Sequence, residues 1–153
     1  MKIQIKLLNS MSSLPSHGSA EAAGYDLRAC RSGREGDYVG DPYDIGPGET
    51  VQIPTGIAMA IPTGYFGAIF ARSGLATKQG LRPATCVGVI DSDYRGEIYV
   101  PLHNDSQEHR RVADGDRIGQ IIIMKHSEIE FEEVDDLTVT ERGTNGFGST
   151  GKD

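Results

Sequence analysis

The sequence predicts an all-β protein with one short helix and a C-terminal arm. Short apolar runs alternate with Gly, Pro and Asp about every 8–12 residues, which is typical of a β-sandwich or barrel. The length of 153 residues fits roughly one domain on the usual scale of 100–200 residues. No internal repeat or linker divides the chain, so a single β domain accounts for most of it.

The apolar runs give the expected strands in chain order. The first run alternates with Lys and Gln, and the later runs are separated by turn dipeptides that contain Pro or Gly. Pro within several of these runs favours edge strands or bulges. We expect strands within residues 3–7, 51–61, 65–71, 87–90, 98–102, 118–124 and 129–134.

One helix and one arm complete the expected organisation. Residues 73–80 predict a short helix that ends at a glycine, as helices often do. Residues 141–153 contain Phe147 as their one large apolar residue. Such a segment buries too little apolar surface to offset the entropy lost on ordering. We therefore expect a β domain over residues 1–140 and a mobile arm over 141–153.

The charge balance limits the partners. With 15 basic and 22 acidic residues, the net charge is −7, which disfavours sequence-independent binding to nucleic acid or an anionic membrane. The chain has no run of about 18 apolar residues and no signal-peptide core at its start. Cys30 and Cys86 make neither a disulfide framework nor a zinc site. We expect a cytoplasmic protein with no nucleic-acid or membrane partner.

Residues 71–76, ARSGLA, have the composition of a phosphate site. A strand ends in Arg-Ser-Gly before a short helix, so N–H groups at the helix start, the Ser73 hydroxyl and the Arg72 guanidinium converge. In the alternative interpretation, Ser73 only caps the helix and Arg72 is solvated. The residues alone do not separate these two interpretations.

Two aspartates stand in motifs of their own. Asp91 follows an apolar run in GVIDSDYRGE, residues 88–97, which predicts a hairpin with Asp-Ser-Asp-Tyr as its turn. An aspartate is ordinarily ionised at neutral pH, so Asp91 could accept a proton from water; a solvated acidic turn is the alternative. Asp26 in AAGYDL, residues 22–27, is expected in a turn, where Asp is favoured.

The arm and one further turn also carry polar groups. The arm reads RGTNGFGSTG over residues 142–151, and its glycines, hydroxyls and Arg142 suit a phosphate. It lacks the Gly-Lys-Ser/Thr element of a Walker A motif, and a flexible terminus is the alternative. Residues 114–120, DGDRIGQ, predict a hairpin turn that leads into a strand carrying Gln120. The histidines show no metal-ligand spacing.

Taken in order, these segments resemble the five motifs of the trimeric deoxyuridine triphosphatase (dUTPase) family. The resemblance implies a distorted jelly-roll-like (β-clip) fold and a homotrimer whose active sites are shared between chains, with the arm reaching a neighbouring chain. It implies Mg²⁺-dependent hydrolysis of dUTP to dUMP and diphosphate, which keeps dUTP low and supplies dUMP for thymidylate synthesis. The matching segments are AAGYDL at 22–27, ARSGLA at 71–76, GVIDSDYRGEI at 88–98, DGDRIGQIII at 114–123 and RGTNGFGSTG at 142–151.

The resemblance also implies roles for single residues. Asp91 is the implied general base, which activates a water to attack the α-phosphorus. Tyr94 is implied to pack under the deoxyribose, so that a 2′-hydroxyl would clash, and the backbone of residues 85–90 is implied to read uracil. Asp26 is implied to support the phosphate side through water or by orienting an arginine. The Mg²⁺ is expected on phosphate oxygens and water, with no direct protein ligand.

Other residues complete the implied substrate site. The start of the helix, with Gln120 beside it, is implied to hold the phosphates. The arm is implied to close over the γ-phosphate through Arg142, Ser149 and Thr150, and Phe147 is implied to stack on the base. The implied substrate-binding residues are Arg72, Ser73, Gly74, Thr85, Val89, Ile90, Tyr94, Tyr99, Gln120, Arg142, Phe147, Gly148, Ser149 and Thr150.

Departures from the family pattern leave alternatives open. Thr85 stands where bacterial members commonly carry Asn, and we expect it to weaken one side-chain contact, because a hydroxyl replaces an amide donor and acceptor. In the arm, Thr144 and Asn145 stand where Ser-Gly is usual. The polar insert at 31–44 is either a solvated surface loop or a partner-binding loop of a regulatory protein on the same scaffold. A dCTP deaminase shares the fold but needs a Glu in its site.

Overall fold

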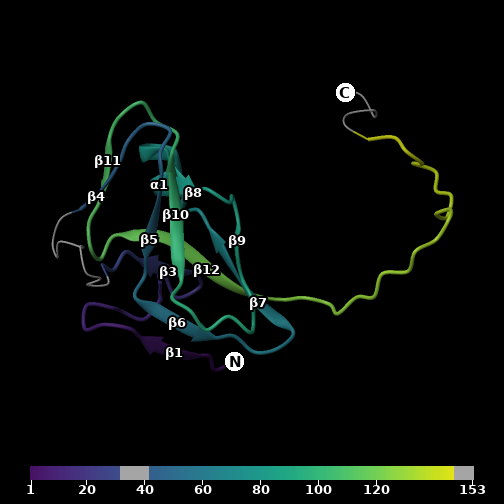
Figure 1. The fold of residues 1–153 in the computed structure, drawn as a ribbon, viewed down its shortest axis with the longest axis horizontal. Helices are drawn as coiled ribbons and strands as arrows, with labels where there is room; N and C mark the ends of the chain where they lie inside the picture. The colour runs from purple at the N-terminus through teal and green to yellow at the C-terminus, as the bar shows by residue number, and fades with distance from the viewer. Residues whose placement is uncertain (32–41, 147–153) are drawn as a thin grey trace.

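The computed structural model describes residues 1–31 and 42–146. They form a β-sheet body that the C-terminal segment leaves as an extended tail (Figure 1). Among the described residues, the prediction of an all-β fold with one short helix is confirmed. The elements are β1 (Gln4–Leu7), β2 (Ser16–His17), β3 (Tyr25–Arg28), β4 (Tyr43–Ile45), β5 (Thr50–Pro54), β6 (Ile57–Ala60), β7 (Tyr65–Phe70), α1 (Ser73–Gln79), β8 (Leu81–Pro83), β9 (Gly88–Ile90), β10 (Tyr99–Asn104), β11 (Arg110–Val112) and β12 (Arg117–Lys125).

The described strands form four antiparallel sheets. The largest has the order β2-β3-β12-β7-β9, so β12 lies at its centre and β9 at one edge. A second sheet has the order β5-β10-β8, and the pairs β1-β6 and β11-β4 complete the body. The register of β7 with β9 runs from Ile69 opposite Gly88 to Gly67 opposite Ile90. This register fixes the height of every β9 residue along β7.

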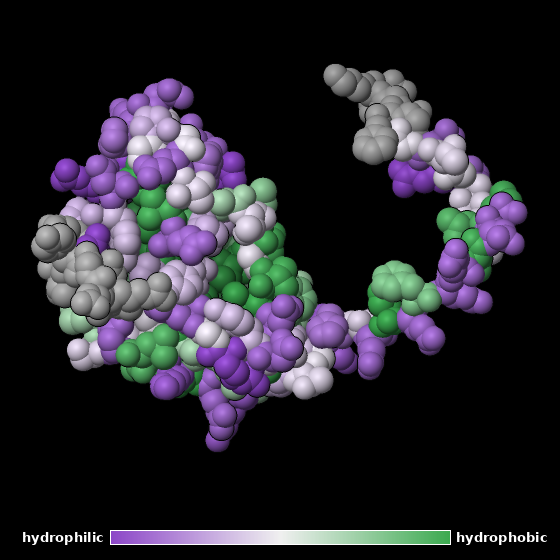
Figure 2. Space-filling view, viewed as in Figure 1, coloured by the Kyte–Doolittle hydropathy of each residue, from purple (hydrophilic) through white to green (hydrophobic). Residues whose placement is uncertain are grey.

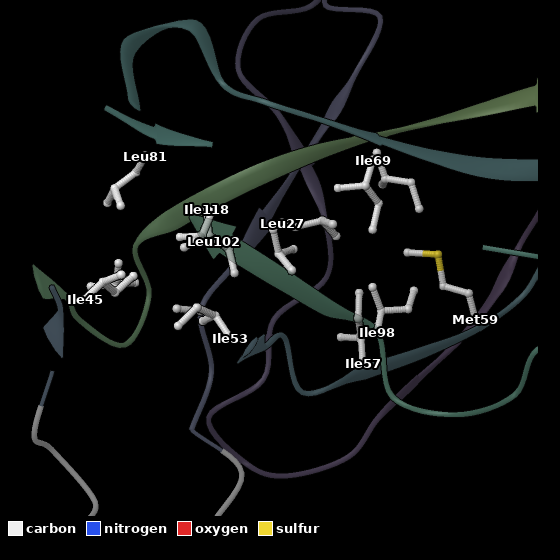
Figure 3. Close-up of a cluster of buried hydrophobic side chains, with 14 of the residues drawn as sticks. Leu27, Ile45, Ile53, Ile57, Met59, Ile69, Leu81, Ile98, Leu102 and Ile118 are labelled. Carbon is white, nitrogen blue, oxygen red and sulfur yellow. The ribbon is translucent and has the colours of Figure 1, made fainter. Parts of the chain in front are cut away.

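Aliphatic side chains fill the space between the sheets (Figure 3). Along β10 every second residue is buried, as a strand with one face on the core requires. Asn104 ends this strand fully buried, and its amide donates to the Ile45 and Glu108 carbonyl oxygens, both at 2.8 Å. Its Oδ1 accepts from Ser106, so this buried polar group is hydrogen-bonded. The labelled core residues are Leu27, Ile45, Ile53, Ile57, Met59, Ile69, Leu81, Ile98, Leu102 and Ile118.

The single described helix, α1, confirms the predicted helical segment. Gly80 follows its last residue with φ at 68°, in the left-handed region, and its N–H donates to the Ala76 carbonyl at 3.1 Å. A Cβ at Gly80 would lie 3.1 Å from Ser106, so both conformation and packing favour glycine there. No helix in residues 1–31 and 42–146 is long and apolar enough to cross a membrane.

The hairpins predicted at residues 88–97 and 114–120 are wrong, because the strands on either side of each turn do not pair with each other, although both turns are present. The Tyr94 N–H donates to the Asp91 carbonyl at 3.2 Å, which closes a turn after β9. However, β9 pairs with β7, whereas β10 pairs with β5 and β8. The turn at Asp114 and Gly115 likewise joins β11 and β12, which lie in different sheets. Local alternation identifies a strand, but tertiary packing selects its partner.

The chain beyond β12 leaves the body, and apolar side chains lie along it (Figure 2). In the described segment 126–146 there is no helix or strand, so the predicted strand within 129–134 is wrong for this chain. Ile129 is 67% and Phe131 89% exposed, because the segment extends away from any sheet edge of its own chain. The division into a domain at 1–140 and an arm at 141–153 stays a prediction.

Candidate active site

The edge strand β9 brings Asp91 to the rim of a cavity of about 280 Å³. Asp91 directly follows the last residue of β9, and its side chain is exposed. A carboxylate beside a water-accessible cavity is placed to act as a general base. The structure thus brings together five predicted residues, named here the β9 group: Val89, Ile90, Asp91, Tyr94 and Tyr99. Gln52, Glu97 and Pro101 complete the lining of the cavity.

Tyr94 stands in the cavity wall in a defined position. Its hydroxyl donates to the Glu97 carbonyl oxygen at 2.9 Å. Gly96 lies against the ring, and a Cβ at this position would overlap the Tyr94 hydroxyl and ring. The side chain is 43% exposed, so one part of it is available to a ligand. The glycine therefore gives the tyrosine its space.

The turn between β8 and β9 carries Thr85, which is exposed and lies outside the lining of that cavity. The next residue, Cys86, has φ at 61°, a conformation uncommon for residues other than glycine. On β8, the Arg82 guanidinium donates to both carboxylate oxygens of Asp105, at 2.6 and 3.1 Å. These hydrogen bonds, together with the charge of Asp105, raise the pKa of Arg82 and fix the strand that leads into the turn.

A buried aspartate holds two arginines beyond the other end of β7. Asp26, in β3, is 8% exposed. Its Oδ1 accepts from Arg72 Nε at 2.8 Å and its Oδ2 accepts from Arg117 Nη1 at 3.2 Å. The expectation of a turn position for Asp26 is wrong, because two cationic partners satisfy the carboxylate within a strand. Asp26 thus binds Arg72, and its role in supporting the phosphate side stays a prediction.

The start of α1 lies next to this pair. Arg72 is itself the N-cap residue, with extended backbone angles and no side-chain cap hydrogen bond, so the capping role considered for Ser73 is wrong. Ser73 and Gly74 open the helix and are both exposed. A Cβ at Gly74 would meet nothing within 4 Å, so the space in front of the helix start is open.

Gln120 joins the same cluster from β12. It lies opposite both Asp26 and Phe70 in the sheet, and its Nε2 donates to the Ala71 carbonyl at 2.9 Å. A Cβ at Gly24 would lie 2.5 Å from Gln120 Oε1, so a larger residue at 24 would displace this side chain. We name Asp26, Arg72, Arg117 and Gln120 the arginine group.

Asp91 of the β9 group and Arg72 of the arginine group lie beyond opposite ends of the β7–β9 pairing within one chain. The register places Asp91 beside Phe66, and both line a second cavity of about 660 Å³. From Phe66 to Arg72 the extended chain covers about 20 Å, at about 3.3 Å per residue. In addition, Arg72 binds Asp26 on β3, which lies across β12 from β7, so its guanidinium points away from β9.

Of the other predicted residues, one is described in the structure. Arg142 is exposed on the extended tail. Phe147, Gly148, Ser149 and Thr150 lie outside the described residues, as does most of the insert at 31–44.

Sequence reasoning missed roles for two charged residues. Arg117 stands within a quoted motif, but its ion pair with Asp26 depends on the register of β3 and β12. Glu97 also stands in a motif, and its carboxylate accepts from the Tyr99 hydroxyl at 2.8 Å and the Gly56 N–H at 2.9 Å. Arg117 begins β12 and Glu97 lies two residues before β10, so each charge directly precedes an apolar run, which was the available signal.

The expectation that Mg²⁺ has no direct protein ligand stays a prediction. In residues 1–31 and 42–146 no group of three or more His, Cys, Asp or Glu side chains could hold a metal ion. Mg²⁺ commonly keeps several waters and binds through substrate phosphates. The cationic arginine group could receive the remaining phosphate charge.

Comparison with known proteins gives matches over nearly the whole chain. The dUTPase family model matches residues 10–151. A deoxyuridine 5′-triphosphate nucleotidohydrolase of Finegoldia magna is 43% identical over 150 residues, which cover 97% of this chain and 99% of that protein. The corresponding protein of Orientia tsutsugamushi is 42% identical, with 99% of each chain covered.

Solved structures show the same fold. The dUTPase of Staphylococcus bacteriophage 80alpha with dUpNHpp has a TM-score of 0.81 and 27% identity, with 99% of each chain covered. The dUTPase of the S. aureus phage phi11 has a TM-score of 0.75 and 23% identity, with 90% of this chain and 98% of that chain covered, and supports the fold alone. A variant of the phi11 protein is described with a structural Mg(II) ion.

Proposed function

The chain belongs to the dUTPase family and is a dUTP diphosphatase, and from this premise we propose how its residues perform the reaction. Asp91 accepts a proton from a water in the 280 Å³ cavity. The water oxygen forms a bond to the α-phosphorus while the bond from that phosphorus to the bridging oxygen breaks. Diphosphate leaves, and dUMP remains. The position of Asp91 directly after β9, at the cavity, supports its role as the base.

The β9 group selects base and sugar. The uracil is read by the backbone between Thr85 and Ile90, whose last three residues form the edge strand β9, where N–H and C=O groups on the side away from β7 can pair with a ligand. A cytosine would present an amino group in place of one carbonyl and leave a backbone group unpaired. The ring of Tyr94 packs under the deoxyribose, so a 2′-hydroxyl clashes.

The arginine group receives the phosphates. Arg72 donates to phosphate oxygens while Asp26 holds its Nε, and the exposed Ser73 and Gly74 add a hydroxyl and amides. Gln120 lies beside them. Residues of the arm, Arg142 to Thr150, close over the γ-phosphate and the base. A Mg²⁺ on the triphosphate, held by phosphate oxygens and water, would neutralise part of its charge.

We propose that these groups meet only in a homotrimer. Asp91 must reach a water beside the α-phosphorus, whereas Arg72 binds phosphates a few bonds further along, so the two must lie close together. Within one chain, Phe66, which lies beside Asp91, and Arg72 are separated by about 20 Å along β7 and the two residues that follow it, and the Arg72 guanidinium points toward β3. Association would also cover an apolar groove of about 710 Å³, lined by residues of β1 and β12, and the exposed apolar side chains of the tail. The separation along β7 carries this proposal.

The first test measures diphosphate release with Mg²⁺ from dUTP, dTTP, dCTP and UTP. We expect release from dUTP alone, and its loss in Asp91→Asn. Release of ammonia from dCTP, or no turnover of dUTP by the folded wild type, would contradict the assignment. In the second case, a binding role on the same scaffold would replace it.

A mixing experiment tests the shared site. Asp91→Asn and Arg72→Ala chains are each expected to be inactive. If one chain supplies Asp91 and another supplies Arg72, refolding the two variants together at equal amounts restores activity to about one quarter of wild type, because each site then draws both intact residues by chance. Mixed chains that stay inactive while forming trimers would show that both residues act from the same chain.

A further inference from the structure

The hydroxyl groups of both tyrosines in the cavity wall donate hydrogen bonds to the same acidic residue. The Glu97 carboxylate accepts from the Tyr99 hydroxyl at 2.8 Å, and its carbonyl oxygen accepts from the Tyr94 hydroxyl at 2.9 Å. Glu97, Tyr94 and Tyr99 all line the 280 Å³ cavity. The position of residue 97 therefore influences the positions of both rings.

The other carboxylate oxygen attaches Glu97 to a rigid part of the body. It accepts from the Gly56 N–H at 2.9 Å. Gly56 has φ at 67°, and a Cβ there would overlap Ser12 Oγ and lie 2.8 Å from Cys30 Sγ, so this backbone is closely packed. Next to it, the buried Thr55 hydroxyl donates to the Ile98 carbonyl at 2.6 Å. Residues 97 and 98 are thus both held to the β5–β6 turn.

We propose that Glu97 is a positioning residue that fixes Tyr94 and Tyr99 in the wall of the 280 Å³ cavity and so sets the preference for dUTP over UTP. This inference rests on the proposed function, in which the Tyr94 ring excludes the 2′-hydroxyl. Steric exclusion depends on the ring staying in place, because a ring that can move away admits the larger sugar. Glu97 is suited to hold the ring because its carboxylate is itself hydrogen-bonded to the closely packed Gly56 backbone.

The test compares kcat and KM for dUTP and UTP in Glu97→Ala, Glu97→Gln and Tyr99→Phe. In Glu97→Ala, the ratio of kcat/KM for dUTP to that for UTP should fall about tenfold, which is the effect of one or two ordinary hydrogen bonds. The change should lie mainly in the KM values and not in kcat. Glu97→Gln should retain most of the ratio, since its amide oxygen can accept from Gly56 and its amide nitrogen can donate to the Tyr99 oxygen. Tyr99→Phe, which keeps the hydrogen bond from Gly56 to Glu97, should show part of the fall in this ratio.

A matched control separates positioning from stability. Glu49 Oε2 also accepts from a glycine N–H, that of Gly46, at 2.8 Å, and it does not line the cavity. Glu49→Ala should leave the dUTP to UTP ratio unchanged. An unchanged ratio in folded Glu97→Ala and in Tyr99→Phe, or a loss in Glu97→Gln as large as in Glu97→Ala, would overturn the inference. Wild type that does not hydrolyse dUTP would instead overturn the proposed function.

Discussion

The two ends of β7 hold their functional side chains in different ways. The β9 group lies at a sheet edge, with an exposed Asp91 and tyrosines held through hydroxyl hydrogen bonds. The arginine group surrounds a buried carboxylate, Asp26, which two guanidinium groups neutralise. An exposed carboxylate can change protonation without disturbing the fold, whereas a buried one couples the fold to its partners. The chain thus separates the exposed carboxylate proposed as the base from a buried carboxylate that is paired with arginines.

The largest expected effect is at the β9 group. Asp91→Asn should lower kcat about 10²- to 10⁴-fold, the range for loss of a general base. Because Asp91 is exposed, the free energy of unfolding should change by less than about 0.5 kcal/mol. Diphosphate release and chemical denaturation of the same preparation measure both quantities. A large loss of stability would show that the two ends are less different than their burial indicates.

At the arginine group, Asp26→Ala should affect stability and binding together. Removing the carboxylate leaves Arg72 and Arg117 without their common partner, and both are partly exposed, which reduces the penalty. We expect a loss of about 1–3 kcal/mol in the free energy of unfolding, below the range for a fully buried pair. KM for dUTP should rise about tenfold as Arg72 loses its orientation. An Asp26→Ala protein with wild-type KM would remove Asp26 from the phosphate site.

Gly24→Ala should produce a smaller effect in the same group. The new Cβ would lie 2.5 Å from Gln120 Oε1 and displace that side chain from the Ala71 carbonyl. We expect KM for dUTP to rise about fivefold, the value of roughly one hydrogen bond. Steady-state kinetics measure it, and Gly46→Ala is the control, because its Cβ would meet only the ends of the Glu49 and His109 side chains. Equal KM values in both variants would separate Gln120 from substrate binding.

The smallest expected effect is at Thr85. Thr85→Asn should raise kcat/KM for dUTP about two- to fivefold, since an amide adds a donor and an acceptor near the base. Stability should not change, because residue 85 is exposed in a turn. An unchanged kcat/KM would mean that backbone groups alone read this side of the ligand.

Among the described residues, the sequence predicts α1 and seven of the twelve strands, because apolar alternation and a terminal glycine are local signals. It does not predict the pairing of β9 with β7, since that partner is chosen by packing between distant segments. The five described strands that the sequence does not predict, β2, β3, β4, β8 and β11, have two to four residues each and give little periodic signal.

The candidate site shows the same division. Motif resemblance named Asp26, Asp91 and Arg72, but the Arg117 ion pair and the Glu97 contacts appear only once strands are in register. The apolar residues at 129–134 predict a strand, but the described segment 126–146 extends away from the body and pairs with none of its sheet edges.

The place of β9 at the edge of its sheet has a consequence for amide hydrogen exchange. A three-residue outer strand, paired on one side, can detach at a lower free energy than the nine-residue β12, which pairs with β3 along its first part and with β7 along the rest. The amides of Gly88 to Ile90 should therefore exchange through local opening, while those of β12 exchange only with global unfolding. A ligand that pairs with the free edge would slow exchange selectively in β9, so occupancy of the site can be read from the backbone of a few residues.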